Sequence, residues 1–98
     1  MKSGYKIIWT NHALHELSVT IKYLQQEWSE AELKKFANAL DHTIEIITRH
    51  PHIYPEYNKK KKIRKAVVDK NNTIYYRIVK MTVEILSVFA TKQSSVDF

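Results

Sequence analysis

The chain contains no cysteine among its 98 residues. Disulfide bonds, thiolate catalysis and cysteine-based zinc sites are therefore excluded. No apolar run approaches the ~20 residues that a membrane-spanning helix requires. Residues 1–5 are not followed by the apolar core of a signal peptide. We find no internal repeat, linker or low-complexity segment apart from a run of lysines, so we expect one cytoplasmic domain over residues 1–98 with a single core.

Positive charge is concentrated in one part of the sequence. Residues 59–80 contain nine of the sixteen Lys and Arg side chains and one acid, whereas residues 10–50 contain four basic and six acidic side chains. The densest stretch is Lys59-Lys60-Lys61-Lys62-Ile63-Arg64-Lys65. Charge gathered in this way indicates an anionic partner, such as nucleic acid or an acidic protein segment. The alternative for the first three lysines is a solvated edge that prevents unwanted strand pairing.

The first half of the chain predicts one strand and two helices. Residues 5–9 are a short β-rich run, and Thr10 is a suitable N-cap for a helix over residues 11–28. Ser29-Glu30-Ala31-Glu32 is a capping box for a second helix, which Pro51 ends. Apolar residues at steps of three and four predict that the helices face each other and the sheet. They are Leu14, Leu17, Ile21, Leu24 and Trp28 in the first helix, and Leu33, Phe36, Leu40, Ile44 and Ile47 in the second.

The second half predicts three strands, over residues 62–69, 73–80 and 83–90. These segments are rich in Val, Ile, Tyr and Phe, and Asn71-Asn72 and Met81-Thr82 are short enough to connect antiparallel neighbours. The expected fold class is therefore α+β, a single domain with the order β-α-α-β-β-β. A helical hairpin would pack on one face of an antiparallel sheet and leave the opposite face for function.

Several segments, in this order, resemble the RelE/ParE superfamily of toxins from type II toxin–antitoxin systems. They are Ile8-Trp9-Thr10, Trp28-Ser29, His50-Pro51, Ile63-Arg64-Lys65, Ile74-Tyr75-Tyr76-Arg77-Ile78 and Val83-Glu84-Ile85-Leu86-Ser87-Val88-Phe89. The resemblance implies a small toxin without cofactor or metal, involved in growth inhibition and plasmid stabilization. It also implies a cognate antitoxin whose C-terminal segment wraps the toxin. The expected assembly is a homodimer of the toxin or a heterotetramer of toxin and antitoxin.

Members of this superfamily follow two modes, and this sequence lacks several parts of one of them. RelE-like members cut messenger RNA on the ribosome without a metal, and ParE-like members inhibit DNA gyrase. In a nuclease, Arg64, Arg77 and Lys92 would be the catalytic set, but Ala66 and Thr73 stand where further cations are expected, and the terminal ring is Phe98, which has no hydroxyl. Cleavage needs a base, a cation and an acid, so we expect a ParE-like toxin that acts by binding. A RelE-like endoribonuclease and a non-toxic, partner-binding relic of the fold are the alternatives.

The cationic strands are where we expect contact with antitoxin or target. The candidate residues are Lys62, Arg64, Lys65, Tyr75, Arg77 and Lys92. For the two arginines the alternative is a salt bridge within the domain, for example to Glu84 across the hairpin. Adjacent residues of a strand point to opposite faces, so one of Tyr75 and Tyr76 is expected in the core and the other open to a partner. No residue by itself decides between gyrase and the ribosome with its messenger RNA as the target.

Overall fold

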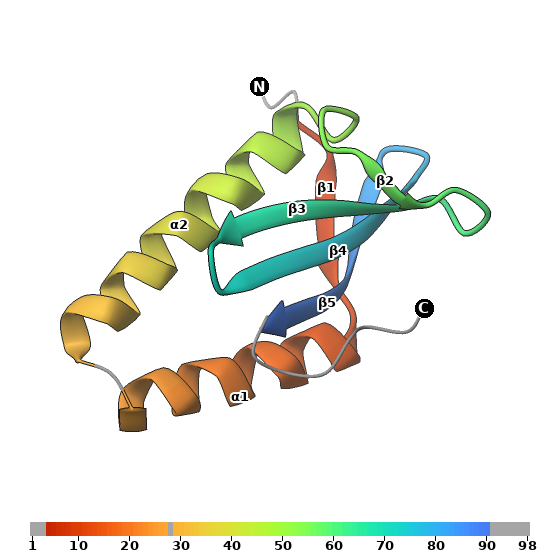
Figure 1. Cartoon of the computed structure of the whole chain (residues 1–98). Coiled ribbons are helices and arrows are strands. Elements are labelled where there is room, and N and C mark those ends of the chain that lie inside the picture. The colour runs from red at the N-terminus through yellow and green to blue at the C-terminus, as the bar shows by residue number, and fades with distance from the viewer. Residues whose placement is uncertain (1–3, 28, 91–98) are drawn as a thin grey trace.

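Two helices and five strands follow one another in the computed structural model, which describes residues 4–27 and 29–90 (Figure 1). The elements are β1 (Lys6–Trp9), α1 (Asn11–Glu27), α2 (Glu30–Arg49), β2 (Glu56–Asn58), β3 (Ile63–Asp69), β4 (Asn72–Val79) and β5 (Thr82–Ala90). The predicted order and fold class are confirmed. The short strand β2 was not predicted, because three residues beside a proline carry no alternating pattern. No helix in the described ranges is long and apolar enough to cross a membrane.

The five strands form one sheet in the order β1-β5-β4-β3-β2. The neighbours among β2, β3, β4 and β5 are antiparallel, whereas β1 pairs with β5 in parallel. The parallel pair arises because both helices intervene between β1 and the rest of the sheet, and a parallel neighbour needs such a long connection. The predicted antiparallel arrangement is thus confirmed for β3, β4 and β5. The unpredicted β2 adds an antiparallel strand at one edge, and β1 lies at the other edge.

Both helices begin where the sequence predicted, and α2 also ends where predicted. Thr10 Oγ1 accepts a hydrogen bond from the Ala13 amide at 3.2 Å and donates one to the Ile85 carbonyl at 2.8 Å, so it caps α1 and ties it to β5. Ser29 Oγ accepts from the Glu32 amide at 3.3 Å and caps α2. Helix α2 ends at Arg49, just before the buried Pro51.

The core lies between the helices and one face of the sheet, and α2 packs against β3 while α1 lies along β5. The helices diverge from their junction (Figure 1), so they enclose the sheet more than they face each other. Buried residues of the core are Ala13, Ile47, Ala66, Ile74, Tyr76, Val83 and Ile85. Leu40 packs against this core as predicted. Leu14, by contrast, is 48% exposed, and α1 buries Ala13 and Thr20 instead, so the predicted stripe of α1 is wrong at Leu14. Trp28 lies outside the described residues.

The position of α1 beside β5 explains this difference. Strand β1 pairs only with Thr82–Ile85, so the rest of β5 has α1 as its neighbour on that side. Glu16 of α1 uses Oε1 to accept the Val88 amide at 3.0 Å and the Ser87 hydroxyl at 2.6 Å. A helix carboxylate thus satisfies a strand amide, and the face of α1 turned to β5 is partly polar.

Candidate functional site

The register of β3 and β4 divides the predicted site residues between the two faces of the sheet. Arg64 pairs with Tyr76, Lys65 with Tyr75, and Ile63 with Arg77. Tyr76 belongs to the core, so Arg64 lies on the face that the helices cover. Because side chains alternate along a strand, Lys65, Tyr75 and Arg77 lie on the opposite side, which we call the second face.

Arg64 is bound within the domain. Its Nη1 donates to the Tyr54 carbonyl at 2.6 Å and to the His52 carbonyl at 3.3 Å, and its Nη2 lies 3.8 Å from the Glu56 carboxylate. The side chain is 19% exposed. Arg64 therefore holds the connector between α2 and β2 (residues 50–55) against the sheet. The resemblance to the toxin superfamily did not indicate this structural role.

Tyr76 holds the same connector from the adjacent strand. Its hydroxyl donates to the Pro51 carbonyl at 2.5 Å, and the side chain is fully buried. Burial raises the pKa of the Tyr76 hydroxyl well above its ordinary value, although the nearby Arg64 guanidinium acts in the opposite direction. A hydroxyl held protonated in this way is a stable hydrogen-bond donor. Tyr76 is the core member of the predicted tyrosine pair.

Arg77 forms the cross-strand ion pair that was the alternative prediction. Its Nε lies 2.7 Å from Oε1 of Glu84, the residue directly opposite on β5. The Arg77 side chain is 48% exposed, so it remains accessible on the second face. The same alternative describes Arg64 as well, but its acidic neighbour is Glu56 and not Glu84.

Tyr75 is less accessible than expected. It is 4% exposed, and its ring lies 4.9 Å from the Tyr57 ring and 6.5 Å from the Phe89 ring, measured between centroids. Burial, and then the neighbouring Tyr57, raise the pKa of Tyr75. The expectation of an open Tyr75 ring is therefore not met, and its part in binding stays a prediction. Tyr57, 43% exposed, is the more accessible ring here. Tyr57 was not among the predicted contact residues, and β2 was not recognised as a strand.

The structure does not assemble the catalytic set of a nuclease from the described residues. Arg64 and Arg77 point to opposite faces, and Ala66, at the expected second cation position, is fully buried in the core. Lys92 and Phe98 lie outside the described residues. Within residues 4–27 and 29–90, no group of three His, Asp or Glu residues could hold a metal ion. Lys62 lies in the loop before β3, and Lys65 is half-buried on the second face. This arrangement offers charge and surface for binding.

The fold is shared with solved toxins of toxin–antitoxin systems. The chromosomal ParDE system from P. aeruginosa matches with a TM-score of 0.73 and 10% sequence identity, over 88% of this chain and 95% of that chain. The E. coli DinJ–YafQ toxin–antitoxin complex matches with a TM-score of 0.61 and 9% identity, over 90% and 93%. The YoeB/ParE toxin from Agrobacterium tumefaciens matches with a TM-score of 0.60 and 13% identity, over 87% and 96%. At these identities the likeness shows the fold alone.

The family is shown by the sequence itself. The family model for the ParE toxin of the type II toxin–antitoxin system parDE matches residues 7–94. The chain therefore belongs to the ParE toxin family. No curated protein sequence matches the chain.

Proposed function

We propose that the chain is a toxin that acts in the cytoplasm by binding and inhibiting DNA gyrase, and that a cognate antitoxin neutralises it. The match of the ParE toxin family over residues 7–94 carries this proposal. Inhibition by binding requires a complementary surface and no acid–base pair. It therefore agrees with a site in which accessible cations are present but do not converge.

The separation of the arginines favours binding over cleavage. A metal-free ribonuclease must bring a base, a cation and an acid to one phosphate. Arg64 is engaged by backbone carbonyls on the helix-covered side, and Arg77 is paired with Glu84 on the second face. Since loss of a single general acid or base costs ~10²–10⁴-fold in rate, a set divided between two faces would leave little cleavage.

The second face suits an acidic, amphipathic antitoxin segment. It presents Lys65 and Arg77 beside Val67 and Val79, which are 57% and 42% exposed. A partner segment that folds on docking could place carboxylates on the cations and apolar side chains on the valines. Lys65→Glu should weaken the complex chiefly by slowing association. Arg64→Glu, an obvious choice from the sequence, would also release the connector and is a poorer probe. Lys62 and Lys92 stay predicted contacts.

Two parallel assays test the proposed target. Purified chain should inhibit supercoiling of relaxed plasmid by gyrase, and antitoxin added first should prevent the inhibition. Primer extension on translated messages shortly after induced expression should show no new 5′ ends. Lys65→Glu is compared with Lys35→Glu on the exposed side of α2 as a charge-matched control.

The remaining outcomes distinguish the two alternative functions. Discrete new 5′ ends without gyrase inhibition would contradict the proposal and indicate a RelE-like endoribonuclease. If neither effect appears while the antitoxin still binds, the chain is a non-toxic binding relic of the fold.

A further inference from the structure

Two turns and the start of β1 lie at one end of the sheet. The loop from Lys59 to Lys62 precedes β3, and the β4–β5 turn contains Lys80. The register places them at the same end, from the β2 edge to the β1 edge, because Ile63 pairs with Arg77 near the end of β4, and the Lys6 amide donates to the Met81 carbonyl at 3.0 Å. We call this region the lysine end and define it by Lys6, Lys59, Lys60, Lys61, Lys62 and Lys80.

Both turns place a lysine where the backbone favours glycine or asparagine. Lys62 has φ of 56° and Lys80 has φ of 57°, and they are the non-glycine residues with positive φ in the described part of the chain. The left-handed conformation brings Cβ close to the backbone and is unfavourable for lysine. Nothing in the turn geometry requires a long cationic side chain at either position. Residues kept in unfavourable conformations often serve a function, and what Lys62 and Lys80 share is positive charge.

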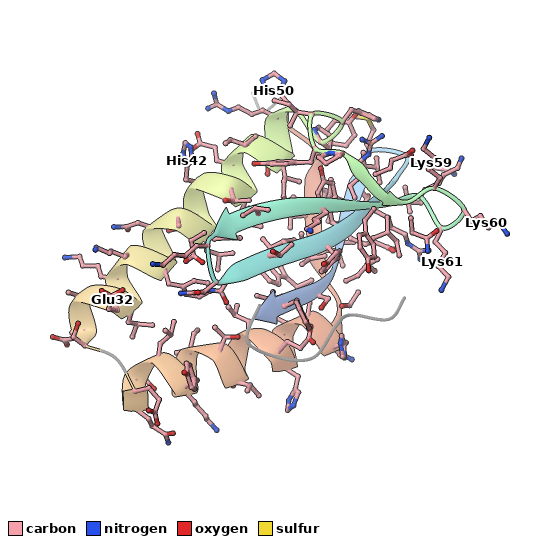
Figure 2. All side chains as sticks on the ribbon, viewed as in Figure 1. Glu32, His42, His50, Lys59, Lys60 and Lys61 are labelled. Atoms are coloured by element: carbon pink, nitrogen blue, oxygen red, sulfur yellow. The ribbon has the colours of Figure 1, made fainter. Side chains whose placement is uncertain are left out.

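The charge of the lysine end is not neutralised within the described residues. The described part of the chain has four ion pairs, whose basic members are His12, Arg49, Arg64 and Arg77. None of these pairs involves a lysine of the lysine end. The loop itself is ordered by hydrogen bonds from the Lys61 amide to Asn58 Oδ1 at 3.0 Å and from the Lys62 amide to the Lys59 carbonyl at 3.3 Å. Figure 2 shows Lys59, Lys60 and Lys61 projecting from this loop, far from Glu32 at the start of α2.

We propose that the lysine end binds the phosphate backbone of a nucleic acid. A duplex carries one negative charge per ~1.7 Å of its axis, and neutralising phosphates with lysines is favourable because bound counterions are released. Lysines on a projecting hairpin are suited to such contacts, which position a protein without reading sequence. The proposal is independent of the toxin's target.

An acidic protein partner and a solvated strand edge both fit the lysine end less well than a nucleic acid does. An acidic protein partner would need several apolar anchors for stable binding. The loop from Lys59 to Lys62 has none, and the β4–β5 turn adds the exposed Met81. A solvated strand edge would be protected by any charged residue on β2 or β3. Edge protection gives no reason for lysine at the left-handed position of the β4–β5 turn.

Fluorescence anisotropy with the purified full chain tests the proposal. The probes are a labelled 20-base-pair DNA duplex and a labelled single-stranded RNA of equal charge, each titrated between 50 and 200 mM salt. The test variant replaces Lys59, Lys60 and Lys61 by glutamine, and the control replaces the exposed Lys22, Lys34 and Lys35 on the helices by glutamine. Lys80→Gln serves as a second, single-site variant, and melting curves verify that every variant is folded.

The expected result is that the test variant binds duplex at least tenfold more weakly at 50 mM salt. The slope of log affinity against log salt should fall in magnitude by about 2 to 3, since each phosphate contact contributes ~0.9. The control should bind like the unchanged chain, and Lys80→Gln should reduce the slope by about 1.

Equal binding of RNA would support the same phosphate chemistry from a second source. If the test and control variants lose the same affinity, binding depends on diffuse net charge and the proposal is wrong. If the chain binds poly-glutamate, used as a third probe, and neither nucleic acid, the proposal is wrong and the partner is an acidic protein.

Discussion

Arg64 and Tyr76 lie directly opposite each other on β3 and β4, and both donate hydrogen bonds to carbonyls of the connector between α2 and β2. Their three carbonyl acceptors belong to Pro51, His52 and Tyr54. The connector has two prolines, Pro51 and Pro55, and little regular structure. The carbonyls of His50 and Pro55 accept backbone amides, whereas the three named above accept from side chains. This pair thus determines how the chain passes from the end of α2 into the edge of the sheet.

Tyr76→Phe removes one of these donors without changing the packing of the ring. The Pro51 carbonyl is then left buried without its partner, and we expect the free energy of unfolding to fall by ~1–3 kcal/mol. Urea denaturation followed by circular dichroism measures this loss. Tyr23→Phe on α1, where the side chain is 43% exposed, is the matched control and should change stability little. A Tyr76→Phe protein as stable as the unchanged chain would contradict the role of this hydrogen bond.

Alkaline pH should destabilise the fold through the same residue. The pKa of Tyr76 is raised by burial from an ordinary value of 10.0. The folded state therefore holds this proton more strongly than the unfolded state does. The contribution is complete below pH 10 and is lost as pH rises above it, by at most about 1.4 kcal/mol per pH unit for one group. Burial also raises the pKa of Tyr54 and Tyr75, so Tyr76→Phe should reduce this pH dependence and not abolish it. Unfolding midpoints between pH 8 and 11 test this difference.

Truncation should affect Arg64 mainly through stability and Arg77 mainly through binding. Arg64→Ala removes donors from two carbonyls and should lower the free energy of unfolding by ~1–3 kcal/mol. Arg77→Ala breaks an exposed ion pair with Glu84, which contributes ~0–1 kcal/mol. If Arg77 contacts the antitoxin, its truncation should instead reduce the affinity of that complex. Equal stability of the two variants would show that the connector is not held by Arg64.

The element order followed from the sequence because its signals are local. Thr10 and Ser29 are caps, Pro51 is a terminator, and each acts on its immediate neighbours. The faces of the predicted site could not be assigned in this way. Strand alternation separates Arg64 from Lys65, but which of them faces the helices depends on tertiary packing. The acceptors of Arg64 lie ten and twelve residues away, in a connector without a pattern.

The contact between α1 and β5 was similarly hidden. Glu16 has the pattern of a solvated helix residue, yet its carboxylate accepts the Val88 amide and the Ser87 hydroxyl. We expect Glu16→Ala to lower the free energy of unfolding by ~1–3 kcal/mol, because both donors lose a charged acceptor. Glu16→Gln keeps one acceptor oxygen and should cost less. Glu27→Ala at the exposed end of α1 is the control. Thermal and urea unfolding measure these stabilities. If the Glu16→Ala and Glu27→Ala proteins are equally stable, Glu16 is only a solvated residue and the contact does not stabilise the fold.

Lys62 and Lys80 offer a case in which glycine should not weaken the fold. Glycine usually destabilises a structured position by roughly 0.5–1 kcal/mol through the entropy of the unfolded chain. At φ of 56° and 57°, however, lysine bears a conformational cost of roughly 1–2 kcal/mol that glycine does not. The two effects leave Lys62→Gly and Lys80→Gly neutral or more stable by up to ~1.5 kcal/mol.

Lys65→Gly in the middle of β3 is the control for this prediction and should be destabilised by ~1 kcal/mol, since its backbone is an ordinary strand. Urea denaturation of the three variants compares them under one condition. Losses at Lys62 and Lys80 as large as the loss at Lys65 would mean that the left-handed conformation bears no cost there. The two lysines would then no longer indicate that charge is kept at the expense of stability. Stability retained in both turn variants, together with weaker nucleic-acid binding, would show that the lysines serve binding and not folding.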